Sequence, residues 1–151
     1  MDGLFYIVKD SYSKGQAAAA VSNIDVIAGN PVYVKIETKK EKTSNAQQRL
    51  AFKWYGEISE QGKEYTIGGI RARCKHRYAL PILLAENSGF AEAWKIVEAS
   101  CDYEQAVDFI ERTQLPMTSI LGVNKMKKYL DDLQNENAHR YALTDPAIYG
   151  L

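Results

Sequence analysis

The segment "SNAQQRLAFKWYGEISEQG", residues 44–62, constrains the fold more than any other part of the chain. Ser44 and Gln47 have the spacing of a capping box, in which two side chains satisfy free amides at the start of a helix. Apolar side chains then recur at every fourth position, at Ala46, Leu50, Trp54 and Ile58. This stripe predicts an amphipathic helix that ends at Gly62 and buries one face against other elements.

Weaker local patterns predict the other elements of a single domain that spans residues 1–151. Short β-rich runs predict strands at 4–10 and 32–39, and apolar and polar residues alternate clearly in the second run. Helices are expected over 11–24, from about 69 to 79, over 90–100 and 102–115, and from about 123 onward. A turn is expected at 28–31, and Pro81 is expected to end the helix before it.

Strands near the N-terminus followed by helices predict an α+β fold, with a small antiparallel or mixed sheet near the N-terminus and several helices. Because an isolated two-stranded sheet is marginally stable, a further strand is expected, and residues 65–68 or 116–121 could supply it. The tail at 142–151 is expected either to be poorly ordered or to dock through its apolar residues.

The charge of the chain is unevenly distributed, although its 19 basic and 19 acidic residues cancel overall. Residues 35–77 hold 11 Lys or Arg and 5 Asp or Glu, a net charge of +6, whereas residues 78–151 have a net charge of −5. A basic middle section can attract a polyanion, while the acidic remainder limits indiscriminate binding.

The basic residues of this middle section are predicted to contact nucleic acid. They come from a charged loop, from the exposed side of the helix at 44–62, and from "RARCKHR" at 71–77. These predicted contacts are Lys39, Lys40, Lys42, Arg49, Lys53, Arg71, Arg73, Lys75 and Arg77. Of these, Arg49, Lys53, Arg73, Lys75 and Arg77 are expected to line one surface, with the lysines of 39–42 on an adjoining loop. Aromatic residues such as Phe52 and Tyr65 lie among them, and single-stranded bases stack on such rings. The alternative is an ordinary solvated face whose charges pair with acids of the C-terminal half.

Signatures of catalysis are nearly absent from the sequence. There is no phosphate-binding loop and no nucleophile motif, and the two cysteines and two histidines have no metal-ligand spacing. Cys74 lies near cations that would lower the pKa of its thiol, so a catalytic pair with His76 is the alternative to a buried helix thiol. We expect a protein that is not an enzyme and that holds no metal or cofactor.

The string "KTSNAQQRLAFKWYGEIS" at 42–59 resembles the signature that opens a helix in the NinB/Orf family of phage recombination proteins. The blocks at 73–87 and 116–134, and the string "LTDP" at 143–146, look like later parts of the same kind of protein. This resemblance implies an α+β homodimer, ring-like around a central channel, that prefers single-stranded DNA. It also implies contact with the host single-strand binding protein.

The function implied by the resemblance is that of a phage or prophage recombination mediator without catalysis. Such a protein helps a recombinase or annealing protein gain access to strands that single-strand binding protein covers. The glutamine and arginine positions of the family correspond here to Gln47 and Arg49, which adds Gln47 to the predicted nucleic-acid contacts.

Two other functions stay open. A metal-dependent nuclease of phage recombination would need converging carboxylates, for which Glu57, Glu60 and Glu64 are the nearest candidates. An adaptor would instead use its basic face to dock an acidic partner tail. The N-terminal residues lack the pattern of a signal peptide, and no segment has the ~18 apolar residues of a membrane span. We therefore expect a cytoplasmic protein of the bacterial host cell that has no membrane contact.

Overall fold

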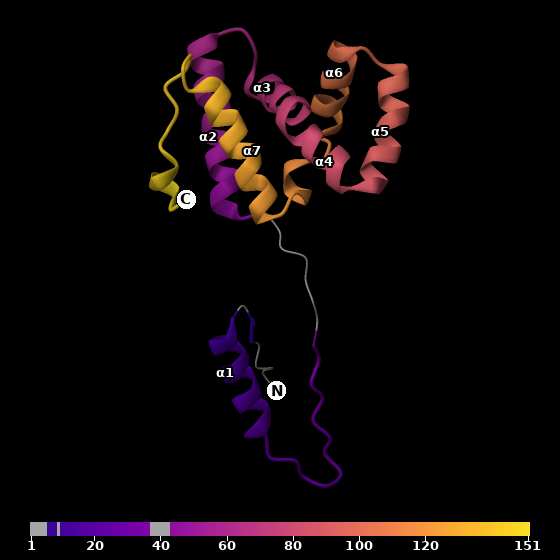
Figure 1. The fold of residues 1–151 in the computed structure, drawn as a ribbon, viewed down its shortest axis with the longest axis vertical. Coiled ribbons are helices and arrows are strands. Elements are labelled where there is room, and N and C mark those ends of the chain that lie inside the picture. The colour runs from indigo at the N-terminus through magenta and orange to yellow at the C-terminus, as the bar shows by residue number, and fades with distance from the viewer. Residues whose placement is uncertain (1–5, 9, 37–42) are drawn as a thin grey trace. The chain divides into compact units, whose positions relative to one another are not determined.

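The computed structural model describes residues 6–8, 10–36 and 43–151 (Figure 1). Contacts between residues divide the chain into two compact units, residues 1–39 and residues 40–151. All the buried apolar side chains of the described ranges belong to the second unit. The expectation of a single domain stays a prediction. No helix in the described ranges is long and apolar enough to cross a membrane.

The described part of the N-terminal unit contains helix α1, Ser11–Ser22. Asp10 caps this helix, since its carboxylate accepts the amide of Ser13 while the Ser13 hydroxyl accepts the amide of Asp10. A single antiparallel bridge between Ile27 and Asn30 closes a tight turn after the helix. The helix and the turn predicted for this part of the chain are confirmed.

The predicted α+β fold is wrong, because the described ranges contain helices and no sheet. Residues 31–36, which include most of the strand predicted at 32–39, form no strand, and their side chains are exposed. Residues 6–8 of the strand predicted at 4–10 form none either. An alternating pattern is a local preference, whereas a strand also needs a neighbouring strand that satisfies its amides and carbonyls. Of the other residues of the two predicted strands, Asp10 caps α1, and residues 4, 5, 9 and 37–39 lie outside the described ranges.

The C-terminal unit is a bundle of helices. Its elements are α2 (Asn45–Gly62), α3 (Ile67–Cys74), the π-helical turn η1 (Lys75–Ala79), α4 (Leu80–Glu86), α5 (Ser88–Ser100), α6 (Tyr103–Thr113), the 3₁₀ turn η2 (Thr118–Ile120), α7 (Val123–Asn137) and the 3₁₀ turn η3 (Pro146–Tyr149). Helix α3 packs between α2 on one side and α6 on the other, and α7 lies alongside α2 (Figure 1). The two segments considered as further strands hold the start of α3 and the turn η2 instead.

Helix α2 confirms the prediction for residues 44–62, including its cap. The Ser44 hydroxyl accepts the amide of Gln47, and the Gln47 side chain accepts the amide of Ser44. The stripe of the helix is almost completely buried, at Leu50, Ala51, Trp54, Tyr55 and Ile58. Because α3, α7 and η3 all pack against α2, its buried face holds these three elements together.

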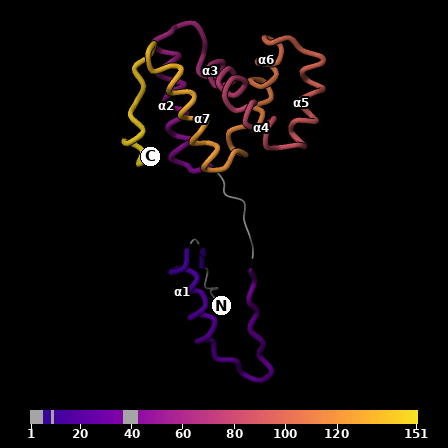
Figure 2. The backbone as a smooth tube through the Cα atoms, in the orientation of Figure 1, coloured from indigo at the N-terminus to yellow at the C-terminus, as the bar shows by residue number. Residues whose placement is uncertain are grey.

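A π-helical turn joins α3 and α4 into one continuous path (Figure 2). In this turn the amide of Leu80 donates to the carbonyl of Lys75, five residues earlier. Pro81 follows directly. A proline lacks the amide hydrogen and its ring clashes with the carbonyl four residues earlier, and a wider turn relieves that conflict. The prediction that Pro81 ends the helix is therefore wrong, since the helical path continues to Glu86.

The C-terminal tail docks on α2 through hydrogen bonds to Thr144. The indole Nε1 of Trp54 donates to the carbonyl of Thr144 over 2.8 Å. The carboxylate of Glu57 accepts from both the amide and the hydroxyl of Thr144. Leu143 and Tyr149 also pack against the core. Of the two expectations for the tail, docking is the one that is confirmed.

Two buried tyrosines connect α2 to α7. The hydroxyls of Tyr55 and Tyr129 lie 2.6 Å apart and share a hydrogen bond, and both side chains are buried. Burial raises the pKa of both phenols above the ordinary value, so both stay neutral. Each hydroxyl is the partner that the other needs, because a buried polar group without a hydrogen bond is costly.

Replacing one of these tyrosines, as in Tyr129→Phe, is expected to lower the free energy of unfolding by roughly 1–3 kcal/mol. The loss arises because the Tyr55 hydroxyl stays buried without its partner. The double variant Tyr55→Phe/Tyr129→Phe is expected to recover most of the loss, because both polar groups are removed together. Urea unfolding of the wild type, of Tyr55→Phe, of Tyr129→Phe and of the double variant measures this. A double variant that loses the sum of the two single losses would contradict this account of the pair.

Candidate nucleic-acid interface

The ten predicted nucleic-acid contacts have different places in the structure. Lys39, Lys40 and Lys42 lie outside the described residues. Gln47 and Lys75 are buried, with 3% and 2% of their surface exposed. The others, Arg49, Lys53, Arg71, Arg73 and Arg77, are at least partly exposed. These five residues belong to two separate clusters.

Gln47 is a structural residue of the interior. Its Oε1 accepts the amide of Ser44 over 3.1 Å, and its Nε2 donates to the carbonyl of Val123 over 2.9 Å. Because both ends of its side-chain amide are engaged, Gln47 has nothing to offer a nucleic acid, and we remove it from the contact surface. The capping-box spacing indicated the first bond, whereas the second depends on the packing of α7 against α2.

Lys75 is also a residue of the interior. Its Nζ donates to the carbonyl of Leu115 over 2.8 Å, which fixes the segment that follows α6. Burial, and secondly the nearby charge of Arg71, lower the pKa of Lys75 to about 8. The prediction that Lys75 lines the same surface as its basic neighbours does not fit this position, so Lys75 is removed as well.

The first exposed cluster, which we name the α2 cluster, consists of Arg49, Phe52, Lys53 and Arg71. Arg49 and Lys53 are exposed and lie one helical turn apart on the same side of α2 as Phe52. The Cζ atom of Arg71, on α3, lies 4.7 Å from the centroid of the Phe52 ring. Phe52 is 45% exposed, although it is a large apolar residue. None of the three cations forms an ion pair with any described residue.

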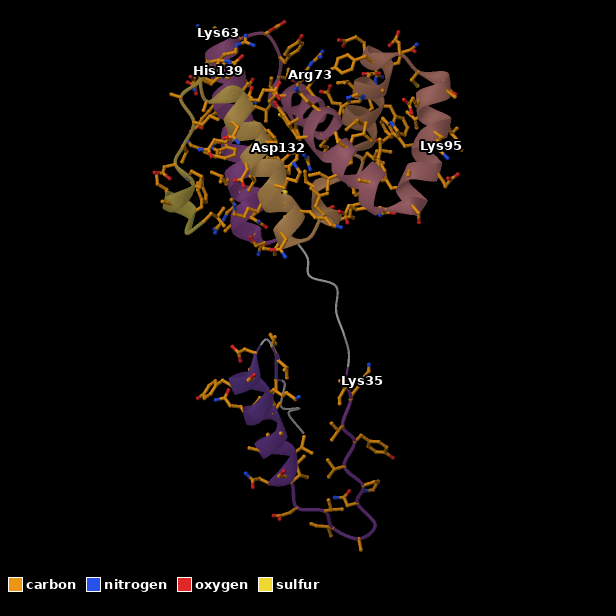
Figure 3. The ribbon with its side chains drawn as sticks, viewed as in Figure 1. Lys35, Lys63, Arg73, Lys95, Asp132 and His139 are labelled. Carbon is orange, nitrogen blue, oxygen red and sulfur yellow. The ribbon has the colours of Figure 1, made fainter. Side chains whose placement is uncertain are left out.

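The second cluster, which we name the arginine pocket, is a cavity of about 210 Å³. Three arginines and several tyrosines line it, among them Arg73, Arg77, Arg140, Tyr65, Tyr103 and Tyr141. The pocket lies near the C-terminal ends of α2 and α7. Figure 3 labels three residues at this end of the unit: Lys63, which follows α2, His139, which follows α7, and Arg73. The arginines of the pocket therefore come from α3, from the π-helical turn and from the segment after α7.

Arg71 and Arg73 belong to different clusters, although only Ala72 separates them. Residues two apart on a helix face different directions. Arg71 contacts Phe52 of α2, whereas Arg73 contacts Glu104 of α6. The single basic surface predicted from the sequence is therefore divided by α3.

Carboxylates of the C-terminal half occupy two of the pocket's arginines. Both terminal nitrogens of Arg73 donate to Glu104, over 3.3 and 3.0 Å, and Arg77 pairs with Glu136. The hydrogen bond from Arg77 lowers the pKa of Glu136 below its ordinary value. Arg73 and Arg77 therefore match the alternative to nucleic-acid binding that was given in the sequence analysis, in which basic residues pair with acids of the C-terminal half. It does not apply to the α2 cluster.

The thiol of Cys74 is not activated. Cys74 is buried, and burial, with a smaller contribution from Glu136, raises the pKa of its thiol to about 12. His76 packs its ring edge-on against Trp94 and Tyr103, with centroids 6.1 and 5.0 Å apart. Because the thiolate is the reactive form of cysteine, the structure offers no support for a catalytic pair of Cys74 and His76.

The carboxylates considered for a nuclease do not converge. Glu57 is engaged by Thr144, and Glu64 lines the arginine pocket. In the described part of the chain, no three His, Cys, Asp or Glu side chains are grouped so that they could hold a metal ion. Two-metal and one-metal hydrolases need such a group, so the nuclease alternative gains no support from these residues.

The sequence reasoning missed the pocket residues of the C-terminal half. Tyr103, Glu136 and Arg140 line the pocket, and Glu104 pairs with Arg73; these four residues lie 30 to 67 residues beyond Arg73 along the chain. They approach the other pocket residues only because α6 and α7 pack on either side of the α3 path. No local pattern in the sequence marks them.

Lys75 is expected to make the stability of the protein rise between pH 7 and pH 9.5. Its pKa is about 8 in the folded chain but about 10.4 in the unfolded chain. The unfolded chain thus binds more protons in this window, so the free energy of unfolding increases with pH, by roughly 2 kcal/mol. The variant Lys75→Met is expected to lack this increase.

Urea unfolding of both proteins at several pH values measures the difference between the two profiles. The raised pKa values of Cys74 and of the buried tyrosines act on both proteins alike, so they cancel in this difference. Parallel profiles would show that Lys75 is not a buried charge in solution.

Comparison of the chain with models of known protein families, with curated proteins and with solved structures finds no match. The resemblance to the NinB/Orf family, seen in short strings of the sequence, therefore stays a prediction. The case for a function depends on the residues and contacts described above.

Proposed function

We propose that this chain binds single-stranded DNA through the α2 cluster and acts as a non-catalytic recombination mediator of a phage or prophage. The observation that carries the proposal is the charge of the cluster. Arg49, Lys53 and Arg71 supply three positive charges, and none of them is neutralised by a carboxylate of the described ranges. Cations of this kind release counterions from a phosphate backbone, which is the main source of affinity for nucleic acid.

The exposed ring of Phe52 supports a single strand as the ligand. Bases of a single strand are free to stack on an aromatic ring, whereas bases in a duplex are already stacked on each other. Arg71 lies against the same ring, so a stacked base would have a cation beside it. Arg49 and Lys53 lie about 6 Å apart along the axis of α2, which lets them contact neighbouring phosphates of one strand.

The role in recombination is proposed from the resemblance to the NinB/Orf family. In this role the chain acts as a homodimer in the cytoplasm of the bacterial host. It contacts single-strand binding protein and helps a recombinase or annealing protein to reach the strand. The role requires no cofactor.

The variant Arg49→Gln/Lys53→Gln is expected to bind single-stranded oligonucleotides at least tenfold more weakly than the wild type at low salt. Its affinity is also expected to fall less steeply with salt, since each lost phosphate contact reduces the slope of log K against log salt by about 0.7 for a single strand. Fluorescence anisotropy with labelled single-stranded and duplex oligonucleotides, at two salt concentrations, measures both effects.

The matched control is Lys127→Gln/Lys128→Gln. It changes the net charge by the same amount, but these two lysines pair with Asp131 and Asp132 on α7. The control is expected to lose less than threefold in affinity. Equal losses in the two variants, or no binding of single strands even at low salt, would contradict the proposal. Binding that does not depend on oligonucleotide length would favour an adaptor for an acidic tail.

A further inference from the structure

The arginine pocket has the size of a site for one small ligand. Its volume of about 210 Å³ is below the ~300 Å³ of the smallest sites for drug-sized molecules. A single phosphate with part of one attached ring system fits such a volume, whereas several nucleotides do not. The chemistry of the lining therefore decides which group it takes.

Three guanidinium groups line this pocket, those of Arg73, Arg77 and Arg140. Guanidinium groups bind phosphate through two parallel hydrogen bonds, which makes arginine the common choice for this anion. Arg140 forms no ion pair with any described residue. The Nε atom of Arg73 is buried and has no hydrogen-bond partner in the described part of the chain. Among the described residues, the pocket thus holds one guanidinium without an ion pair, that of Arg140, and one whose buried Nε donor is unused, that of Arg73.

Flat surfaces accompany these cations. The Cζ atom of Arg73 lies 3.8 Å from the centroid of the Tyr65 ring and 5.8 Å from that of Tyr103. Arg140 lies 5.4 Å from the centroid of the Tyr141 ring. A nucleobase stacks on tyrosine rings and on guanidinium planes alike. The lining therefore matches both parts of a nucleotide, the phosphate and the base.

The carboxylates of both ion pairs in the pocket are exposed, and the side chain of Arg77 is 64% exposed as well, whereas that of Arg73 is 22% exposed. The side chains of Glu104 and Glu136 are 69% and 42% exposed. Ion pairs between exposed groups contribute little, because water screens them. A terminal phosphate carries a charge of about −1.5 to −2 and offers more acceptor oxygens than a carboxylate. A phosphate can therefore take Arg73 and Arg77 from their carboxylate partners.

An acidic peptide fits this pocket less well than a nucleotide does. Glu64, Glu104 and Glu136 are all in or beside the pocket, and they would repel a run of peptide carboxylates. A nucleotide has one compact anionic group, and its base carries N–H donors that a glutamate can accept. The carboxylates repel a phosphate too, but a nucleotide brings one anionic group where an acidic peptide brings several, so the nucleotide meets less repulsion.

We propose that the arginine pocket binds one phosphorylated nucleotide, held by Arg73, Arg77 and Arg140, and that its phosphate displaces Glu104 and Glu136. The inference rests on the proposed function in one respect, since the nucleotide is taken to be the end of a bound single strand. The α2 cluster supplies affinity along the strand, and the pocket recognises its phosphorylated end.

The test uses deoxyadenosine 5′-monophosphate as the probe, titrated into the full chain by calorimetry, with deoxyadenosine as the probe that lacks the phosphate. The monophosphate is expected to bind and deoxyadenosine is not. Arg77→Gln and Arg140→Gln are each expected to weaken binding at least fivefold. Glu136→Gln is expected to tighten it about two- to fivefold, because it removes the competing carboxylate. Lys128→Gln, on α7 and outside the pocket, is the control.

A purely structural role of Glu136 would give the opposite sign, since the variant would then bind more weakly. That result, or no binding of the monophosphate by the wild type, would overturn the inference. Tighter binding of an aspartate-rich peptide than of the monophosphate would overturn it too. Circular dichroism of each variant shows whether it is folded.

The two proposals fail in different ways. If the monophosphate does not bind but single strands bind through Arg49 and Lys53, the pocket is wrong and the proposed function stands. If the monophosphate binds but single strands do not, the pocket is a nucleotide site and the proposed function is wrong.

Discussion

The burial of one face of α2 is the constraint on which the rest of the C-terminal unit depends. Trp54 and Tyr55 are almost completely buried, and each also makes a polar contact that specifies a neighbour. The indole of Trp54 holds the C-terminal tail, and the hydroxyl of Tyr55 holds α7. Burial of large apolar groups is not directional, whereas these hydrogen bonds are. The combination determines which elements pack on α2 and in which register.

The opposite side of α2 follows from the same constraint. Once the stripe that contains Leu50 and Trp54 is buried, Arg49 and Lys53 must face outward, and their exposure could be predicted from the sequence. Their association with Arg71 could not, because it depends on how α3 crosses α2 at Phe52. A helical period predicts which residues share a face, but the packing of two helices decides which faces meet.

Charged residues were the hardest to place from the sequence. Lys75 is a cation like Arg71, Arg73 and Arg77 around it, which are at least partly exposed, and lysine is rarely buried in proteins. In the structure its neighbours Cys74, Tyr78 and Ala79 are buried with it, and its Nζ donates to the carbonyl of Leu115, 40 residues later. The strands failed for a related reason, since a β-rich run states a preference but not a partner. In both cases the deciding information lies in residues distant along the chain.

The π-helical turn before Pro81 has a consequence for how this chain tolerates change in length. The turn contains one residue more than an α-helical turn would, so the faces of α3 and α4 are offset by about 100°. This offset lets α3 pack against α2 and α6 while α4 packs against α5. Deleting a single residue of 75–79 would remove this offset and rotate α4 away from α5. Length variation among related chains should therefore be excluded from this turn and concentrated in the connections between helices.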